Sequence, residues 1–155
     1  MITHHVELDL DAVPQAVFDW LTDARNHPRW DDTSVEMELL QPGPWRAGSE
    51  FREVRRMGGR RVEFRSRLAS LERGRGFDTE SLSGPEFHGH WRVEPAGSTT
   101  RLRWWCEMKV GGPARLVEPL IARSFRRQVS ANFARLKTLI EADLGSQTRG
   151  PEPRA

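Results

Sequence analysis

Residues 99–110, Thr-Thr-Arg-Leu-Arg-Trp-Trp-Cys-Glu-Met-Lys-Val, carry the clearest structural signal in the chain. Every second residue from position 102 is apolar, while arginine, glutamate or lysine stands at most of the positions between. Alternation with a period of two is typical of a strand in an antiparallel sheet that has one buried and one solvated face. The apolar members are Leu102, Trp104, Cys106, Met108 and Val110.

The same period of two recurs upstream. Phe87, Gly89, Trp91 and Val93 alternate with charged residues and histidines, so residues 86–94 are predicted to form the neighbouring strand. Turn-forming glycines, prolines and serines separate these runs, and Gly58-Gly59 is typical of a tight hairpin. Further strands are predicted over residues 2–10, 34–39, 49–57, 60–71 and 77–82.

Helical spacing appears in two places, between the first two predicted strands and after the last one. Asp11 and Pro14 open a short helix. Residues 26–32 are expected to form a turn or a second short helix. After Gly111-Gly112-Pro113 the apolar residues step by three or four, which predicts a long amphipathic helix with a kink at Pro119. Its apolar stripe comprises Val117, Ile121, Phe125, Val129, Phe133, Leu136 and Ile140.

Length and composition favour one globular domain. The chain has 155 residues, of which 37% are apolar and 30% charged. We expect a domain over residues 1–144 and a disordered polar tail over residues 145–155. Cys106 is the only cysteine, so an intramolecular disulfide is excluded. A signal-peptide pattern and a membrane-length apolar run are both missing, which favours a cytoplasmic location.

Four segments together resemble the SRPBCC superfamily, which includes START and polyketide cyclase/dehydrase-like proteins. Residues 12–23 resemble its first helix and Pro28-Arg29-Trp30-Asp31 the turn that follows. Residues 48–51 resemble the segment in which a glycine opens the family's third strand. Residues 132–141 resemble the end of its C-terminal helix. The resemblance implies an α+β helix-grip fold, in which a curved antiparallel sheet of about seven strands wraps around a long C-terminal helix and two short helices follow strand 1.

This fold also implies a cavity between the sheet and the C-terminal helix. Hydroxyl groups in phase with the inward aromatic residues, and the small Gly89 among them, favour a pocket that orients a ligand. A completely filled core is the alternative interpretation. The predicted ligand-binding residues are Phe64, Ser66, Phe77, Thr79, Phe87, Trp91, Trp104, Met108, Phe125 and Val129.

Other reactive side chains point less clearly to a site. Glu53 and Arg55 share the phase of Phe51. If they were buried, they could pair with each other or with a ligand carboxylate or carbonyl, but an edge strand with two solvated faces is the interpretation we favour. His88 and His90 could offer two metal ligands, but both lie on the face expected to be solvated and lack a third ligand. Cys106 is expected to be inert packing.

The sequence therefore predicts binding of a small hydrophobic or aromatic molecule, lipid-like or polyketide-like, in the internal cavity. One alternative is a polyketide cyclase or dehydratase in the same cavity. Glu53, Arg55, Ser66 and Thr79 are the candidates for that reaction, although they form no convincing catalytic set. Another alternative is an interaction module whose arginine-rich surface binds an anionic partner.

No metal, cofactor, specific nucleic acid or membrane insertion is expected. The oligomeric state is expected to be a monomer or a homodimer. Whether the protein is an enzyme does not follow from the residues, because the fold alone does not identify a reaction.

Overall fold

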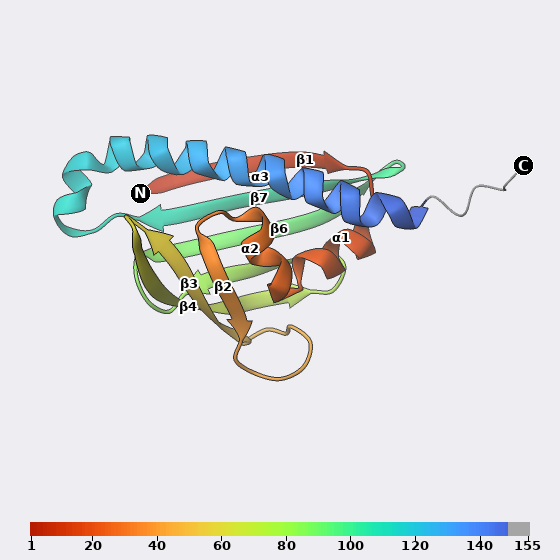
Figure 1. Ribbon diagram of the computed structural model, residues 1–155, viewed down its shortest axis with the longest axis horizontal. Helices are drawn as coiled ribbons and strands as arrows, with labels where there is room; N and C mark the ends of the chain where they lie inside the picture. The colour runs from red at the N-terminus through yellow and green to blue at the C-terminus, as the bar shows by residue number, and fades with distance from the viewer. Residues whose placement is uncertain (149–155) are drawn as a thin grey trace, which may run out of the picture.

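The structure, a computed structural model, describes the backbone of residues 1–148 and the side chains of residues 1–145. One sheet of seven antiparallel strands forms its centre, in the order β1-β7-β6-β5-β4-β3-β2 (Figure 1). The predicted helix-grip fold is confirmed. The strands are β1 (Ile2–Leu10), β2 (Ser34–Leu39), β3 (Glu50–Met57), β4 (Arg60–Glu72), β5 (Gly76–Ser81), β6 (Glu86–Ala96) and β7 (Thr99–Lys109).

The helices lie between β1 and β2 and after β7. The first group comprises α1 (Pro14–Leu21), the 3-10 turn η1 (Ala24–Asn26) and α2 (His27–Trp30). After β7 come the 3-10 turn η2 (Gly112–Val117) and the long helix α3 (Glu118–Thr148). In Figure 1, α3 runs along the β1 and β7 side of the sheet. We call the face of the sheet that α1 and α3 cover its inner face.

The ends of α3 differ from the sequence-based expectation. Pro119 is the second residue of α3, so it begins the helix and does not kink it. Its missing N–H would have no partner within the first turn in any case. The helix also continues through residues 145–148, which we assigned to the tail. The rest of that predicted tail, residues 149–155, lies outside the described residues.

The strand register places the inner-face aromatic residues as their alternation predicts. Trp91 pairs with Trp104 and with Phe77 on its two neighbouring strands. Phe87, four residues before Trp91, pairs with Met108, four residues after Trp104. Because successive side chains of a strand point to opposite faces, these residues share one face.

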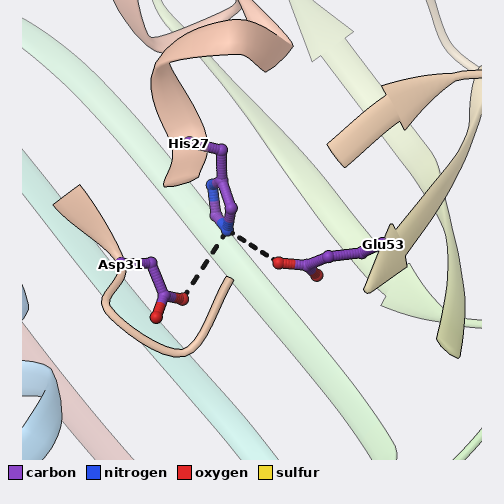
Figure 2. Close-up of side chains that lie close together, drawn as sticks. All are labelled: His27, Asp31 and Glu53. Atoms are coloured by element: carbon purple, nitrogen blue, oxygen red, sulfur yellow. Dashed lines mark ion pairs between the residues drawn. The ribbon is translucent and has the colours of Figure 1, made fainter. Parts of the chain in front are cut away.

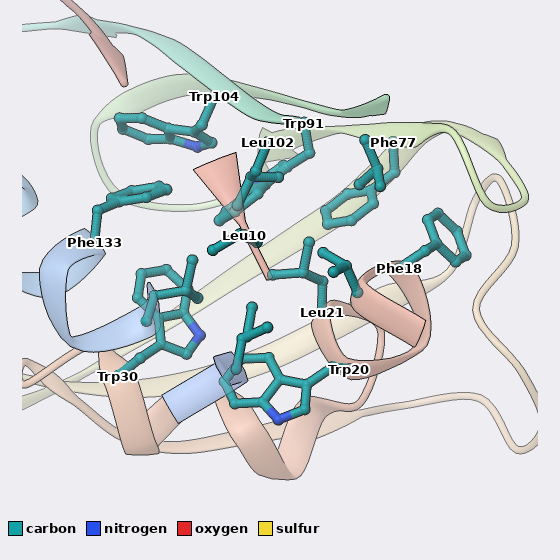
Figure 3. Packing of buried hydrophobic residues seen from close by; sticks show 14 of the residues in the cluster. Leu10, Phe18, Trp20, Leu21, Trp30, Phe77, Trp91, Leu102, Trp104 and Phe133 are labelled. Carbon is teal, nitrogen blue, oxygen red and sulfur yellow. The ribbon is translucent and has the colours of Figure 1, made fainter. Parts of the chain in front are cut away.

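Phe133 of α3 packs against three indole rings and joins the helix to the sheet (Figure 3). Its ring centroid lies 5.0 Å from that of Trp104, 5.6 Å from that of Trp91 and 5.6 Å from that of Trp30. Offset and edge-to-face pairs at these separations add to the free energy gained by burial. We call Trp30, Phe77, Trp91, Trp104 and Phe133 the aromatic core.

Two buried aromatic residues of the hydrophobic core come from segments in which neither strand nor helix periodicity indicated burial. Trp30 ends α2, and Trp45 lies in the loop between β2 and β3; both are buried. The Trp45 ring centroid lies 4.5 Å from that of Phe51 and 5.7 Å from that of Phe77. The loop therefore covers one end of the inner face.

None of the helices among residues 1–148 is both long enough and apolar enough to span a bilayer.

Replacing Phe133 by alanine should lower the free energy of unfolding by about 3–5 kcal/mol, because it leaves a cavity among three indoles. Phe125→Ala, eight residues earlier in α3, is the matched control. Its side chain is partly exposed and should cost clearly less. Urea denaturation followed by circular dichroism measures both values, and equal losses would contradict the assigned packing of α3.

Candidate functional site

The predicted ligand-binding residues fall into two groups. Phe77, Trp91, Trp104 and Val129 are buried, and the three aromatic residues belong to the aromatic core. A ligand could reach these rings only by displacing their neighbours. The other six are partly exposed on the inner side of the molecule, and we call them the open half of the inner face. They are Phe64, Ser66, Thr79, Phe87, Met108 and Phe125.

The open half presents apolar side chains from three strands and from α3. Phe87 and Phe125 pack on one side against the core and leave part of their rings accessible. Met108 is the cross-strand partner of Phe87. Phe64 lies over the turn between β5 and β6, where a Cβ on Gly84 would come within 2.5 Å of its ring. Accessible aromatic surface on an inner face is the type of surface that apolar ligands cover.

The hydroxyl groups in this region are only partly available to a ligand. Ser81 donates to the Pro85 carbonyl and accepts from the Phe87 amide, so it holds the turn after β5. Thr79 donates to the Gly89 carbonyl at 3.3 Å. A Cβ on Gly89 would lie 2.8 Å from the Thr79 hydroxyl oxygen, so Gly89 is needed for close strand packing and leaves little vacant space.

Glu53 and Arg55 do not lie on a strand with two solvated faces. The edge-strand interpretation that we favoured from the sequence is therefore wrong. Only 12% of the Glu53 side chain and 31% of the Arg55 side chain are exposed. An Arg55 guanidinium nitrogen lies 3.1 Å from Glu53 Oε1, and another lies 3.0 Å from Asp31 Oδ2. The reason is tertiary, because α2 and the residues after it lie over this end of β3.

His27 completes this group from the start of α2 (Figure 2). Its Nε2 lies 3.1 Å from Glu53 Oε1 and 3.6 Å from Asp31 Oδ2. His27 and Asp31 are four residues apart, which brings their side chains to one face of a helical turn. We call His27, Asp31, Glu53 and Arg55 the ion-pair cluster.

Neighbouring polar groups fix the orientation of Asp31. Its Oδ1 accepts from the Thr33 hydroxyl at 2.7 Å and from the Asn132 side-chain amide of α3 at 3.0 Å. Thr33 in turn accepts from Arg55 at 2.9 Å. Buried charges require such partners, and these contacts join α2, β3 and α3.

The cluster shifts the pKa values of its members in the directions that stabilise charge. Burial by itself lowers the pKa of His27, but the carboxylates of Asp31 and Glu53 outweigh it and raise that pKa above 6.5. Burial by itself raises the pKa of Glu53, but His27 and Arg55 lower it to about 2. The same two cations hold the pKa of Asp31 well below 3.8 against the effect of burial. At mildly acidic pH the cluster therefore holds two positive and two negative charges.

The hydrogen bonds of the cluster are incomplete. His27 Nε2 and Glu53 Oε1 are close but not well directed, and neither makes a hydrogen bond of good geometry. The Ser34 hydroxyl is also buried; it lies near Glu53 but makes no hydrogen bond of good geometry within residues 1–145. Unsatisfied buried polar atoms are costly, and their concentration at one place points to a functional role for the cluster.

His27, Asp31 and Glu53 could also be considered as metal ligands, since one atom from each lies within 4.8 Å of the others. The guanidinium of Arg55, however, contacts the same two carboxylates at 3.0 and 3.1 Å. A divalent cation would have to displace Arg55 and would meet its positive charge. The donor set therefore fits an ion-pair network better than a metal centre.

The ion-pair cluster borders the open half of the inner face. In the register of β3 and β4, Glu53 pairs with Phe64 and Arg55 pairs with Val62. Charged groups and accessible apolar groups thus lie side by side on adjacent strands. Such a combination can hold an apolar molecule and make hydrogen bonds to one polar group on it.

The histidines His88 and His90 lie on the opposite, outer face of the sheet. His90 stacks on Trp105, with ring centroids 5.0 Å apart, and its Nδ1 lies 2.9 Å from Asp78. His88 lies 3.8 Å from Glu86. Within residues 1–145 neither belongs to a group of three metal-ligating side chains.

Cys106 is buried between β1 and β6, as the alternation predicted. Burial raises the pKa of its thiol to about 12, which disfavours the thiolate that a nucleophilic cysteine requires at neutral pH.

Two open hollows flank β1, and neither is bordered by a predicted ligand-binding residue. One, of about 320 Å³, lies between β1 and β7 beside Trp105. The other, of about 350 Å³, lies between β1 and α3 beside Phe133. The open half of the inner face and the ion-pair cluster remain the candidate site because they combine accessible aromatic surface with charged hydrogen-bonding groups.

Comparison with protein families gives one match. A family model described as polyketide cyclase/dehydrase and lipid transport matches residues 1–141. No curated protein matches the chain.

Solved structures share the fold at low sequence identity. A Thermus thermophilus protein, TTHA0849, is 17% identical with a TM-score of 0.77; the match covers 91% of this chain and 98% of that one. The Zhui aromatase/cyclase from Streptomyces sp. R1128 is 17% identical with a TM-score of 0.65, covering 96% and 97%. The di-domain aromatase/cyclase StfQ from the steffimycin biosynthetic pathway is 16% identical with a TM-score of 0.77, covering 95% of this chain and 52% of that one.

Replacing Asp31 by asparagine should lower the free energy of unfolding by about 3–5 kcal/mol, because it leaves buried cations without a counter-charge. Asp32→Asn is the matched control, since Asp32 is exposed and its carboxylate accepts from the Gln128 amide at the surface. Chemical denaturation measures both. An Asp31→Asn variant as stable as the control would contradict the description of the cluster.

The cluster also predicts the sign of a pH dependence. The raised pKa of His27 gives stabilisation that is complete below pH 6.5 and lost as the pH rises through the folded-state value. The lowered pKa of Glu53 gives stabilisation that is complete above pH 4.5 and lost as the pH falls towards about 2. The free energy of unfolding should therefore fall above pH 6.5, and His27→Gln should reduce this fall.

Unfolding measured from about pH 5 to about pH 9, a range that brackets the ordinary histidine pKa, tests this difference. His88→Gln is the control for removing an exposed imidazole on the outer face. An unchanged pH profile in His27→Gln would show that the imidazole is not stabilised in its charged form.

Proposed function

The chain belongs to the polyketide cyclase/dehydrase and lipid transport family, and we propose that it binds one small apolar or aromatic molecule on the open half of its inner face. The observation that carries this proposal is the accessible aromatic surface of Phe64, Phe87 and Phe125 beside a buried charged cluster. The aromatic core forms the floor beneath the ligand.

Arg55 is the group best suited to orient the ligand. Its side chain is 31% exposed, whereas the Asp31 and Glu53 side chains that hold it are 8% and 12% exposed. An arginine fixed by two carboxylates presents its remaining N–H groups in a constant direction. A carbonyl, phenol or carboxylate on an otherwise apolar molecule would accept those hydrogen bonds.

A second candidate is cyclisation or dehydration of a polyketide-like substrate, and the ion-pair cluster favours it. Ring closure followed by loss of water requires a base that takes a carbon-bound proton, an acid that protonates the leaving hydroxyl, and a donor for developing negative charge on oxygen. His27, with its raised pKa, is suited to be that acid, and the neutral imidazole left after this transfer is the base that takes the carbon-bound proton. Arg55 is suited to be the donor. Glu53 and Asp31 are weak bases because their pKa values are lowered, so their role would be to position His27 and Arg55.

Titration with a fluorescent acylnaphthalene tests the binding proposal. We expect saturable binding with one-to-one stoichiometry, and Phe87→Ala should weaken it about tenfold through lost apolar contact. Arg55→Lys should weaken binding of the acylnaphthalene more than binding of naphthalene, which has no oxygen. Val13→Ser, at an exposed position outside the site, is the control.

Melting temperatures recorded on the same samples separate lost binding from lost folding. Absence of saturable binding by the folded wild type, or equal weakening by Val13→Ser, would refute the proposal. Turnover of a polyketide-like substrate that disappears in His27→Gln, while probe affinity is kept, would favour the enzyme over the binding protein.

A further inference from the structure

Large apolar side chains are exposed around one end of the sheet. β3, β5 and β7 finish at this end and β1, β4 and β6 begin there, as their antiparallel register requires. η2 follows β7 directly, so it stands at the end of the sheet where β7 finishes (Figure 1). We call this region the loop end. Its exposed apolar residues are Met1, Met57, Val62, Leu82, Leu116, Val117 and Leu120.

Apart from the N-terminal Met1, Leu116 and Leu120 are the most accessible apolar residues of the loop end. Leu116 is 88% exposed and Leu120 is 68% exposed. They are four residues apart, on either side of the junction between η2 and α3. Leucine side chains with this much accessible surface gain free energy when an apolar phase covers them.

The loop end is also rich in arginines that make no ion pair among residues 1–145. Three belong to the hairpin of β3 and β4, and three to η2 and α3. By contrast, Arg52, Arg65 and Arg67, further along the same two strands, are all paired with glutamates. The arginines without an ion pair are Arg56, Arg60, Arg61, Arg115, Arg123 and Arg127.

Two acidic residues of the loop end are already neutralised. Glu86 pairs with Lys109 at 3.2 Å, and Glu118 pairs with the N-terminal amine at 2.9 Å. Glu107, near the end of β7, is exposed and makes no ion pair among residues 1–145, but the six arginines outnumber it and leave the loop end with an excess of positive charge.

We propose that the loop end docks on the surface of an anionic lipid bilayer without crossing it. Apolar side chains that insert among acyl chains, with arginines at the level of the headgroups, are the recognised combination for peripheral membrane binding. The apolar residues stand on separate turns and not on one continuous patch. A fluid bilayer can cover such separated side chains, whereas a protein partner requires a contiguous, complementary surface.

This inference does not depend on the proposed ligand, although the two fit together. Val62 belongs to the loop end and pairs with Arg55, so the loop end adjoins the open half of the inner face. An apolar molecule could pass between the bilayer and that site without crossing a long aqueous path.

Co-sedimentation with vesicles tests the docking proposal on the full chain. We expect binding to vesicles that contain phosphatidylglycerol, little binding to phosphatidylcholine alone, and loss of binding at high salt. Leu116→Ser/Leu120→Ser and Arg60→Gln/Arg61→Gln should each weaken binding about tenfold or more, since each basic residue near such a surface contributes about fivefold.

Leu40→Ser/Arg73→Gln is the matched control, because both residues are exposed at the opposite end of the sheet. It should bind anionic vesicles as the wild type does. Lack of binding to anionic vesicles, or equal weakening by the control, would overturn the proposal. So would light scattering that shows a dimer which Leu116→Ser/Leu120→Ser dissociates, if the wild type does not bind vesicles, because a second copy would then be the occupant.

Discussion

The contact between Arg55 and the buried carboxylates of Asp31 and Glu53 is the constraint on which the candidate site depends. A charge inside a protein persists only where counter-charges and hydrogen bonds replace water. Meeting that requirement brings α2 over β3 and, through Asn132, fixes both against α3. The ion-pair cluster thereby closes one side of the inner face and determines which part of it remains accessible.

The inner face is divided between packing and recognition. Around Phe133 the aromatic rings fill the space between α3 and the sheet. Towards the loop end the rings of Phe64 and Phe87 are only partly covered. The filled part gives the domain its rigidity, and the open half presents apolar surface next to charged groups. Rigid support beneath a partly exposed surface is the arrangement that fixed binding geometry requires.

The strands and the long helix could be predicted from the sequence because their periodicity reports which face is buried. Alternation placed Trp91 and Trp104 on one face correctly. The burial of Glu53 could not be predicted in this way, because it results from α2, a segment distant in sequence. The separation of four residues between His27 and Asp31 was the available signal for the cluster, but only the fold shows that β3 lies opposite them. Trp45 gave no periodic signal because it lies in a loop.

The central claim is that an apolar ligand lies on the open half of the inner face with a polar atom directed at Arg55. A crystal structure of the protein grown with an acylnaphthalene tests it most directly. The account predicts the rings between Phe64, Phe87 and Phe125, with the carbonyl oxygen within hydrogen-bond distance of the Arg55 guanidinium. A ligand found instead in one of the hollows beside β1, with the inner face unchanged, would contradict it.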